Sequence, residues 1–265
     1  MKTLSLDSII YQDNDFLVFN KSAGMISNRS QTTTGLETVQ DWVDKHLKIT
    51  LPKAGEIDSI KDEEEQSRAR DFINRCGLVH RLDKETSGLL LIAKNFQAFK
   101  NLQLQFKERQ VEKKYLALVH GETPLKGTIE AAITRNPFNR QKFGVFLSGK
   151  EAKTEYLRLE LFKPNFKING KDLGKFSLLE LSPKTGRTHQ IRVHLKFLGY
   201  PLVADEKYAG RKTFKLDYSW CPRHFLHACF LSFNHPATGK KVSFFSKLPL
   251  DLQIAMIKIK ENVEK

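Results

Sequence analysis

Residues 80–88, HRLDKETSG, lead directly into the apolar run LLLIA at residues 89–93. The apolar run predicts a strand buried on both faces, and the turn-prone Thr-Ser-Gly before it predicts a tight entry to that strand. Asp83 is then held at the edge of a core, between Arg81 and Lys84. Because a nearby cation favours the charged form of a carboxyl group, we expect Asp83 to be ionised. A rigid carboxylate is a candidate nucleophile or general base, and the alternative is a structural salt bridge.

The composition indicates a globular protein with a basic surface. A chain of 265 residues allows one large domain or two small ones, and 40% apolar residues support a sizeable core. Lys and Arg outnumber Asp and Glu by 44 to 30, which gives a net charge of +14. Such an excess favours a polyanionic partner such as a nucleic acid, although charge alone does not distinguish it from a basic protein that binds no anion.

The sequence also predicts where the protein works. The three cysteines, Cys76, Cys221 and Cys229, cannot all pair within the chain, and residues 1–7 lack the apolar region of a secretory signal. A cytoplasmic location is therefore expected. The longest apolar run, residues 89–93, is far short of the roughly 20 residues that span a bilayer, which argues against a membrane protein.

Alternation and helical spacing predict many strands with a few helices between them. Residues 9–11 and 16–19 form a predicted hairpin, and strands are expected at 111–119, 154–162, 175–181 and 225–233. Helices are expected over 36–47, after a cap at Asn95, and from Pro249 onward. The stretch 52–70 is interpreted as an exposed loop or solvated helix inserted between core elements. This pattern is typical of an α+β fold.

Four further segments accompany residues 80–88. They are IIYQDNDFLVFNKSAG at 9–24, KKYLALVHG at 113–121, GRTHQIRVHL at 186–195 with LGYPL at 198–202, and LHA with FNHPATG within 226–239. In this order, the five segments resemble the motifs of the RluA-type pseudouridine synthases. A single short motif would be weak evidence, whereas five in order are strong evidence.

The resemblance implies an α+β fold with a mixed, largely antiparallel β-sheet, flanking helices and a central cleft. It implies one catalytic domain over residues 1–265. Because the opening hairpin begins by residue 9, no separate N-terminal RNA-binding domain is expected. The implied activity is conversion of uridine to pseudouridine in structured RNA, either ribosomal or transfer RNA. This isomerisation exchanges no electrons, so no cofactor is expected, and we expect the enzyme to act as a monomer.

Residue by residue, the resemblance implies that Asp83 is the catalytic carboxylate. It leaves open whether Asp83 attacks C1′ of the sugar or abstracts its 2′ proton. Tyr115 would lie beside the base and could remove the C5 proton, although a free tyrosine with a pKa of about 10 is a poor base at neutral pH. Arg192 would hold Asp83, on a short helix that Thr188 could cap. Arg187 is the competing choice and could instead meet an RNA phosphate.

Three further residues complete the implied site. Leu181 would form an apolar wall of the base pocket, with plain core packing as the alternative. His80 and Arg81 would help to flip the base out of its stack or fill the gap that it leaves. For His80 the alternative is a structural hydrogen bond. Ser22 and Ala204 depart from the family, which usually has Pro and Gly at these positions.

The sequence leaves three other interpretations. Cys221, His224, His227 and Cys229 are residue types that bind metals, but their spacing matches no standard zinc pattern, so no metal is expected. A non-catalytic RNA-binding or assembly factor on the same fold would be expected to have lost Asp83, Tyr115 or Arg192, and all three are present. A metal-dependent nuclease is the third possibility, and it would be sensitive to EDTA.

Overall fold

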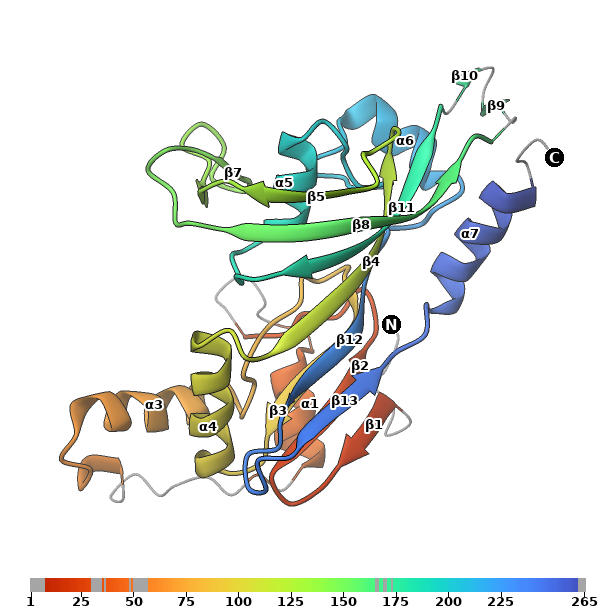
Figure 1. Ribbon diagram of the computed structural model, residues 1–265. Coiled ribbons are helices and arrows are strands. Elements are labelled where there is room, and N and C mark those ends of the chain that lie inside the picture. The colour runs from red at the N-terminus through yellow and green to blue at the C-terminus, as the bar shows by residue number, and fades with distance from the viewer. Residues whose placement is uncertain are drawn as a thin grey trace. The chain divides into compact units, whose positions relative to one another are not determined.

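The computed structural model describes residues 8–29, 35, 37–47, 49, 57–164, 167–168, 171–172 and 174–261 (Figure 1). It comprises two compact units, each built from separate stretches of the chain. The first unit consists of Met1–Glu112 and Phe230–Ser246, and the second of Lys113–Cys229 and Lys247–Lys265. Within the described residues, no helix is both long and apolar enough to cross a bilayer.

The first unit is a set of antiparallel strands covered by helices. Its strands are β1 (Ile9–Gln12), β2 (Phe16–Lys21), β3 (Ser87–Ala93), the end of β12 (Leu226–Asn234) and β13 (Lys241–Phe245). Its helices are α1 (Val39–His46), α3 (Glu63–Asn74) and α4 (Phe96–Lys107). β2 pairs antiparallel with both β1 and β3, and all seven residues of β3 are buried. The predicted buried strand is thus confirmed, and it fixes the end of the segment that carries Asp83.

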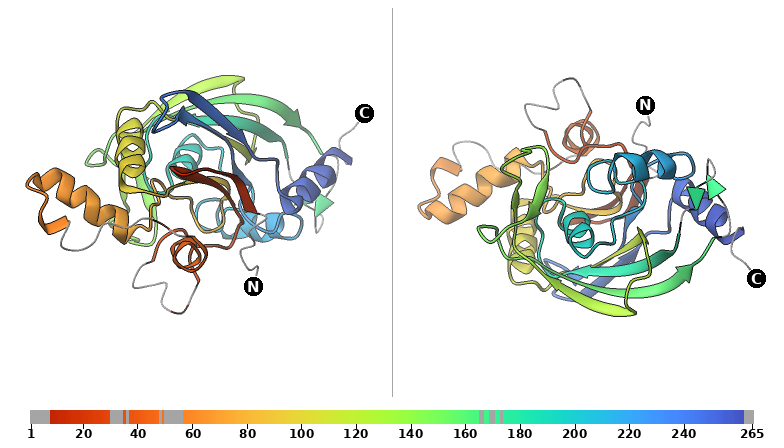
Figure 2. Two further views of the ribbon diagram at one scale, coloured as in Figure 1. Left: turned by 90° about the horizontal axis from the view of Figure 1, so that it is seen from below. Right: turned by 90° about the horizontal axis from the view of Figure 1, so that it is seen from above.

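The second unit contains a four-stranded antiparallel path in the order β4-β11-β8-β5. Its strands are β4 (Glu112–His120), β5 (Lys126–Glu130), β6 (Ile133–Arg135), β7 (Phe143–Val145), β8 (Lys153–Phe162), β9 (Lys167–Ile168), β10 (Lys171–Asp172) and β11 (Phe176–Pro183). Its helices are α5 (Gln190–Phe197), α6 (Arg211–Tyr218) and α7 (Leu250–Glu261). β8 and β11 lie side by side in every view (Figures 1 and 2). The predicted α+β class, with its largely antiparallel sheet and flanking helices, is confirmed.

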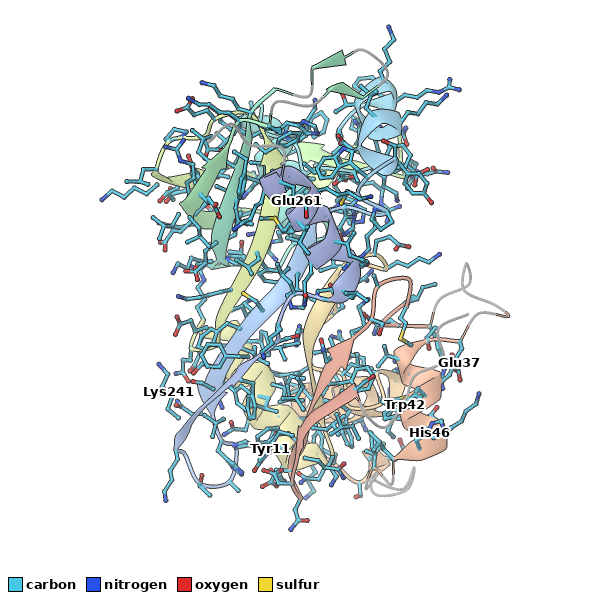
Figure 3. All side chains as sticks on the ribbon, turned by 90° about the vertical axis from the view of Figure 1, so that its right-hand side faces the viewer. Tyr11, Glu37, Trp42, His46, Lys241 and Glu261 are labelled. Atoms are coloured by element: carbon cyan, nitrogen blue, oxygen red, sulfur yellow. The ribbon has the colours of Figure 1, made fainter. Side chains whose placement is uncertain are left out.

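Local signals in the sequence account for the helix boundaries. Asn95 caps α4 as predicted, because its side-chain oxygen accepts the N–H of Ala98 at 2.9 Å. Thr38 and Asp41 form a reciprocal capping box at the start of α1. One turn further along α1, the rings of Trp42 and His46 stack with 5.0 Å between their centroids (Figure 3).

Other predicted elements appear with shifted ends. Residues 52–56 of the predicted stretch 52–70 lie outside the described residues, and the helix α3 begins at Glu63 and continues to Asn74, with Ala69 and Phe72 as its buried residues. β8 forms as expected, but its alternating leucines are not its buried side: Leu157 and Leu159 are 43% and 48% exposed, whereas Tyr156 is buried. Leu36 and Val263, which were assigned to predicted helices, lie outside the described residues.

Candidate active site

The backbone on both sides of Asp83 is held by the loop that follows β2. The Ser27 hydroxyl donates to the carbonyl oxygen of Leu82 at 2.9 Å and accepts the N–H of Leu82 at 3.2 Å. On the other side, the N–H of Gly24 donates to the carbonyl oxygen of Lys84 at 2.9 Å. Asp83 therefore lies between two anchored peptide groups, which restricts how its carboxylate can move.

Lys21 is the buried charge beneath this loop. It is 0% exposed, and its ammonium donates to the carbonyl oxygens of Ser22, Met25 and Lys84, each at 3.0 Å. An ammonium has three N–H donors, and burying it without such partners would be costly. Lys21 contacts Ser22 through its backbone oxygen, which a proline would also have. Serine in place of the family's proline therefore leaves this contact intact.

The residues before and after Asp83 differ in their surroundings. Arg81 and Lys84 are exposed, and neither side chain forms an ion pair with another described residue. His80 is half-buried: its Nε2 accepts the N–H of Leu91 at 3.0 Å, and its ring stacks on Phe106 with 5.1 Å between centroids. The structural hydrogen bond that was the alternative for His80 is thus present, while its role in base flipping stays a prediction.

Tyr115 and Leu181 are brought together in the second unit. They face each other across β4 and β11, and both contact an apolar cluster that includes Ile191 of α5. Leu181 is fully buried and Tyr115 half-buried. Tyr115, Ala117 and Val119 alternate along β4 and share one of its faces. Leu181 therefore lies in the core beside Tyr115, and its contact with a bound base stays a prediction.

Lys113 lies two residues before Tyr115, so the same face of β4 carries both side chains. Burial lowers the pKa of the Lys113 ammonium to about 8. Sequence analysis did not single out this residue. The available signal was its spacing of two from Tyr115, which distinguishes it from Lys114 on the opposite face.

Arg192 is bound to a carboxylate within its own unit. Its Nε donates to Oδ2 of Asp205 at 2.8 Å and its NH2 to Oδ1 at 2.9 Å, with side chains 7% and 0% exposed. The guanidinium also lies over the ring of Tyr208, 5.1 Å from its centroid. Burial alone would raise the pKa of the Asp205 carboxyl, but the hydrogen bonds and charge of Arg192 outweigh it and hold this pKa below its ordinary value.

The backbone conformation of Ala204 explains why the family usually has glycine before Asp205. Ala204 adopts a φ of 55°, in the left-handed region that glycine occupies without strain. Its N–H donates to Oδ2 of the buried Asp217 at 2.8 Å, and Asp205 in turn accepts the N–H groups of Lys207 and Tyr208. These hydrogen bonds hold the turn in place although alanine replaces glycine.

The prediction that Thr188 caps the helix carrying Arg192 is wrong. α5 begins at Gln190, and His189 takes the capping position with a φ of 55° and no side-chain cap. The Gln190 side chain ties the turn instead, because its Oε1 accepts from the N–H of Arg187 at 2.9 Å and from the Thr185 hydroxyl at 2.7 Å. Arg187 itself is exposed, and its Nε donates to the carbonyl oxygen of Glu151 at 3.1 Å.

The four Cys and His residues weighed as metal ligands do not form a cluster in the described part of the chain. There, the only group with ligand atoms within 4.8 Å of one another is Asp13, Asp15 and His235. The Cys221 thiol donates to a backbone carbonyl oxygen, and burial raises its pKa to about 12, which disfavours the thiolate that binds metals.

Hydrogen bonds explain the group of Asp13, Asp15 and His235. Nε2 of His235 donates to Oδ2 of Asp13 at 3.0 Å, and its Nδ1 accepts the N–H of Ala237 at 3.2 Å. Oδ1 of Asp13 accepts the N–H groups of Asp15 and Phe16. This network closes the turn between β1 and β2.

Comparison with known proteins identifies the family of the chain. A family model described as RNA pseudouridylate synthase matches residues 15–197. An uncharacterized RNA pseudouridine synthase of Chloroflexus aurantiacus is 43% identical over 188 residues, which are 71% of this chain and 55% of that protein. Ribosomal large subunit pseudouridine synthase D of Pseudomonas aeruginosa is 35% identical over 253 residues, which are 92% of this chain and 68% of that protein.

A solved structure agrees with these matches. Human RNA pseudouridylate synthase domain containing 1 superposes with a TM-score of 0.64 at 30% identity, covering 94% of this chain and 87% of that one. The chain therefore belongs to the RNA pseudouridylate synthase family, as its motifs indicated. The match spans only a little over half the length of the Chloroflexus relative.

Proposed function

We propose that the protein isomerises uridines of structured RNA, ribosomal or transfer RNA, to pseudouridine. The observation that carries this proposal is the anchored peptide on each side of Asp83. A carboxylate that must reach one sugar atom requires such restraint. The Pseudomonas relative is named for the large ribosomal subunit, which makes ribosomal RNA the first substrate to test.

The reaction defines what each side chain must do. The N1–C1′ bond of uridine breaks, the base rotates, a C5–C1′ bond forms, and the proton lost from C5 is balanced by one gained at N1. Asp83 supplies the carboxylate near the sugar, either as nucleophile at C1′ or as base at the 2′ position. Tyr115 supplies the surface beside the base. Lys113 lies on the same face of β4, and its charge would influence how readily the Tyr115 hydroxyl gives up its proton. Arg192 supplies the cation that meets Asp83.

The direct test is tritium release from C5-labelled uridine in ribosomal and transfer RNA. Mapping of pseudouridine in RNA from cells with and without the gene would then identify the positions. A non-catalytic RNA-binding factor would bind these RNAs without releasing tritium. A metal-dependent nuclease would cleave them and stop when EDTA is added, whereas isomerisation without a cofactor continues. The cytoplasmic location and monomeric state stay predictions.

RNA binding should weaken steeply as salt rises. Arg81 and Lys84 are exposed beside Asp83, and neutralising each phosphate contributes a slope of about 0.7 for single strands to 0.9 for duplexes in log K against log salt. A stem-loop should also be a better substrate than a duplex of equal length, because a loop uridine is more easily flipped. Titrations at several salt concentrations check both expectations, and salt-insensitive binding would contradict the electrostatic account.

Replacing Ser27 with Ala should lower turnover more than affinity. The substitution removes both hydrogen bonds to Leu82, so the peptide before Asp83 loosens; a misplacement of about 1 Å can cost up to about 100-fold in rate. The matched control is Ser22→Ala in the same loop, where only the backbone oxygen is used by Lys21. Steady-state tritium release, with melting temperatures for both variants, separates kcat from KM. A change in KM alone would contradict a positioning role for Ser27.

A further inference from the structure

Phe138 is the most exposed of the large aromatic side chains among the described residues, at 93%. It lies in the turn between β6 and β7, in the second unit. A phenylalanine ring is normally buried, because transferring its surface out of water is favourable. Full exposure of the ring at the end of a hairpin therefore needs a reason.

The turn that carries Phe138 is well ordered by hydrogen bonds. Oδ1 of Asn136 accepts the N–H groups of Phe138 and Asn139 at 2.8 and 3.1 Å. The N–H of Asn136 donates to the carbonyl oxygen of Lys142, and the N–H of Lys142 donates to that of Asn139, both at 2.9 Å. The ring is thus presented on a fixed turn, so that little conformational entropy is lost when a partner stacks on it.

The hairpin around this ring is uniformly basic. Residues 133–150 contain Arg135, Arg140, Lys142 and Lys150 and no Asp or Glu. No ion pair of these four side chains with another described residue is present, although the Arg135 guanidinium donates to the carbonyl oxygen of Arg140 and lies over the Phe143 ring. An exposed aromatic face among unpaired cations matches the chemistry of an unpaired nucleotide, whose base stacks while its phosphates meet the cations. The other fully exposed apolar side chain of this region is Leu147, which has no aromatic face to stack on a base; a membrane surface, which would use both side chains, is the alternative occupant.

Hydrogen bonds connect this hairpin to the surroundings of Arg192. The N–H of Phe143, at the start of β7, donates to the hydroxyl of Tyr208 at 3.0 Å. That hydroxyl also bonds Nδ1 of His189 at 2.9 Å, and the guanidinium of Arg192 lies over the same tyrosine ring. A nucleotide held at Phe138 would therefore be fixed relative to the arginine that we assign to the site.

We propose that Phe138 is a stacking platform for an unpaired base of the RNA, distinct from the uridine that is isomerised, and that Arg135, Arg140 and Lys142 contact the phosphates beside that base. This inference rests on the proposed function only in taking RNA as the substrate. It assigns to the hairpin a share of affinity and of target choice, and no part in the chemical step.

The test compares Phe138→Ala with Phe138→Trp and with Leu147→Ala. Leu147 is a matched control, because it is 106% exposed in the same hairpin region but has no aromatic face. Phe138→Ala should raise both the Kd for a substrate stem-loop and KM by about 5- to 100-fold, while kcat changes less than about twofold. Phe138→Trp should restore binding, and Leu147→Ala should bind as the wild type does.

A scan of the stem-loop with single abasic nucleotides identifies the stacked base. One abasic position, outside the target uridine, should weaken binding to the wild type and cause no further loss in Phe138→Ala. Unchanged affinity of Phe138→Ala, or an equal loss with every abasic RNA, would overturn the proposal. A change in sedimentation or in binding to anionic lipid vesicles, with RNA affinity unchanged, would assign the ring to a second copy or a membrane instead. If the wild type releases no tritium, the proposed function is contradicted. The Kd values of the Phe138 and Leu147 variants would still test whether Phe138 stacks on an RNA base.

Discussion

Replacing Asp83 with Asn should abolish uridine isomerisation while the protein stays folded and bound to RNA. Asparagine keeps the shape of the side chain but removes the negative charge that the chemistry uses. The hydrogen bonds from Ser27 and Gly24 hold backbone groups on either side of position 83, so the substitution leaves them in place. Turnover should fall at least about 100-fold, the lower range of what one positioned acid–base group contributes.

Tritium release and a filter-binding assay measure the two halves of this expectation separately. Glu85→Gln is a suitable control, since it removes one negative charge two residues further along the same segment. Release at nearly the wild-type rate would remove Asp83 from the catalytic role. A loss of melting temperature together with a loss of binding would instead support the structural salt bridge that was the alternative reading of this carboxylate.

The elements of the fold could be predicted because their signals are local. Five consecutive apolar residues were enough to predict β3, and the side chain of Asn95 was enough to place the start of α4. The hold on Asp83 could not be predicted in this way. The hydrogen bonds between Ser27 and Leu82 join residues 55 positions apart, and no periodicity connects them.

The candidate site shows the same limit. The sequence placed Tyr115 and Leu181 on strands, and the register that makes them face each other became visible only in the sheet. The cap at Thr188 was wrong because a glutamine two positions later uses its amide to tie the turn, which composition alone does not reveal. No role was expected for Asp205, although it is the bidentate partner of Arg192.

Replacing Arg192 with Met should damage both turnover and stability, whereas Arg187→Met should be mild. Removing Arg192 leaves Asp205 buried without its partner, and breaking a buried ion pair in this way costs about 3–5 kcal/mol of unfolding free energy. Arg187 is exposed, so its loss should change stability by no more than about 0.5 kcal/mol and act mainly on RNA affinity. Denaturant unfolding and tritium release of the two variants measure these differences.

The pH dependence of the stability difference between the wild type and Arg192→Met is the control for this prediction. The lowered pKa of Asp205 in the folded protein means that its ionised form stabilises the fold above the unfolded value of about 3.9, and that this contribution is lost as the pH falls through the folded value. In Arg192→Met burial is no longer outweighed and raises the pKa of Asp205 above its unfolded value, so the stability gap to the wild type should be largest near neutral pH and should narrow as the pH falls through that raised value. Adding Asp205→Asn to Arg192→Met removes the unpaired charge and should recover stability without restoring turnover, because the cation that we propose for Asp83 is still missing. If Arg187→Met loses more turnover than Arg192→Met, the roles of the two arginines are reversed.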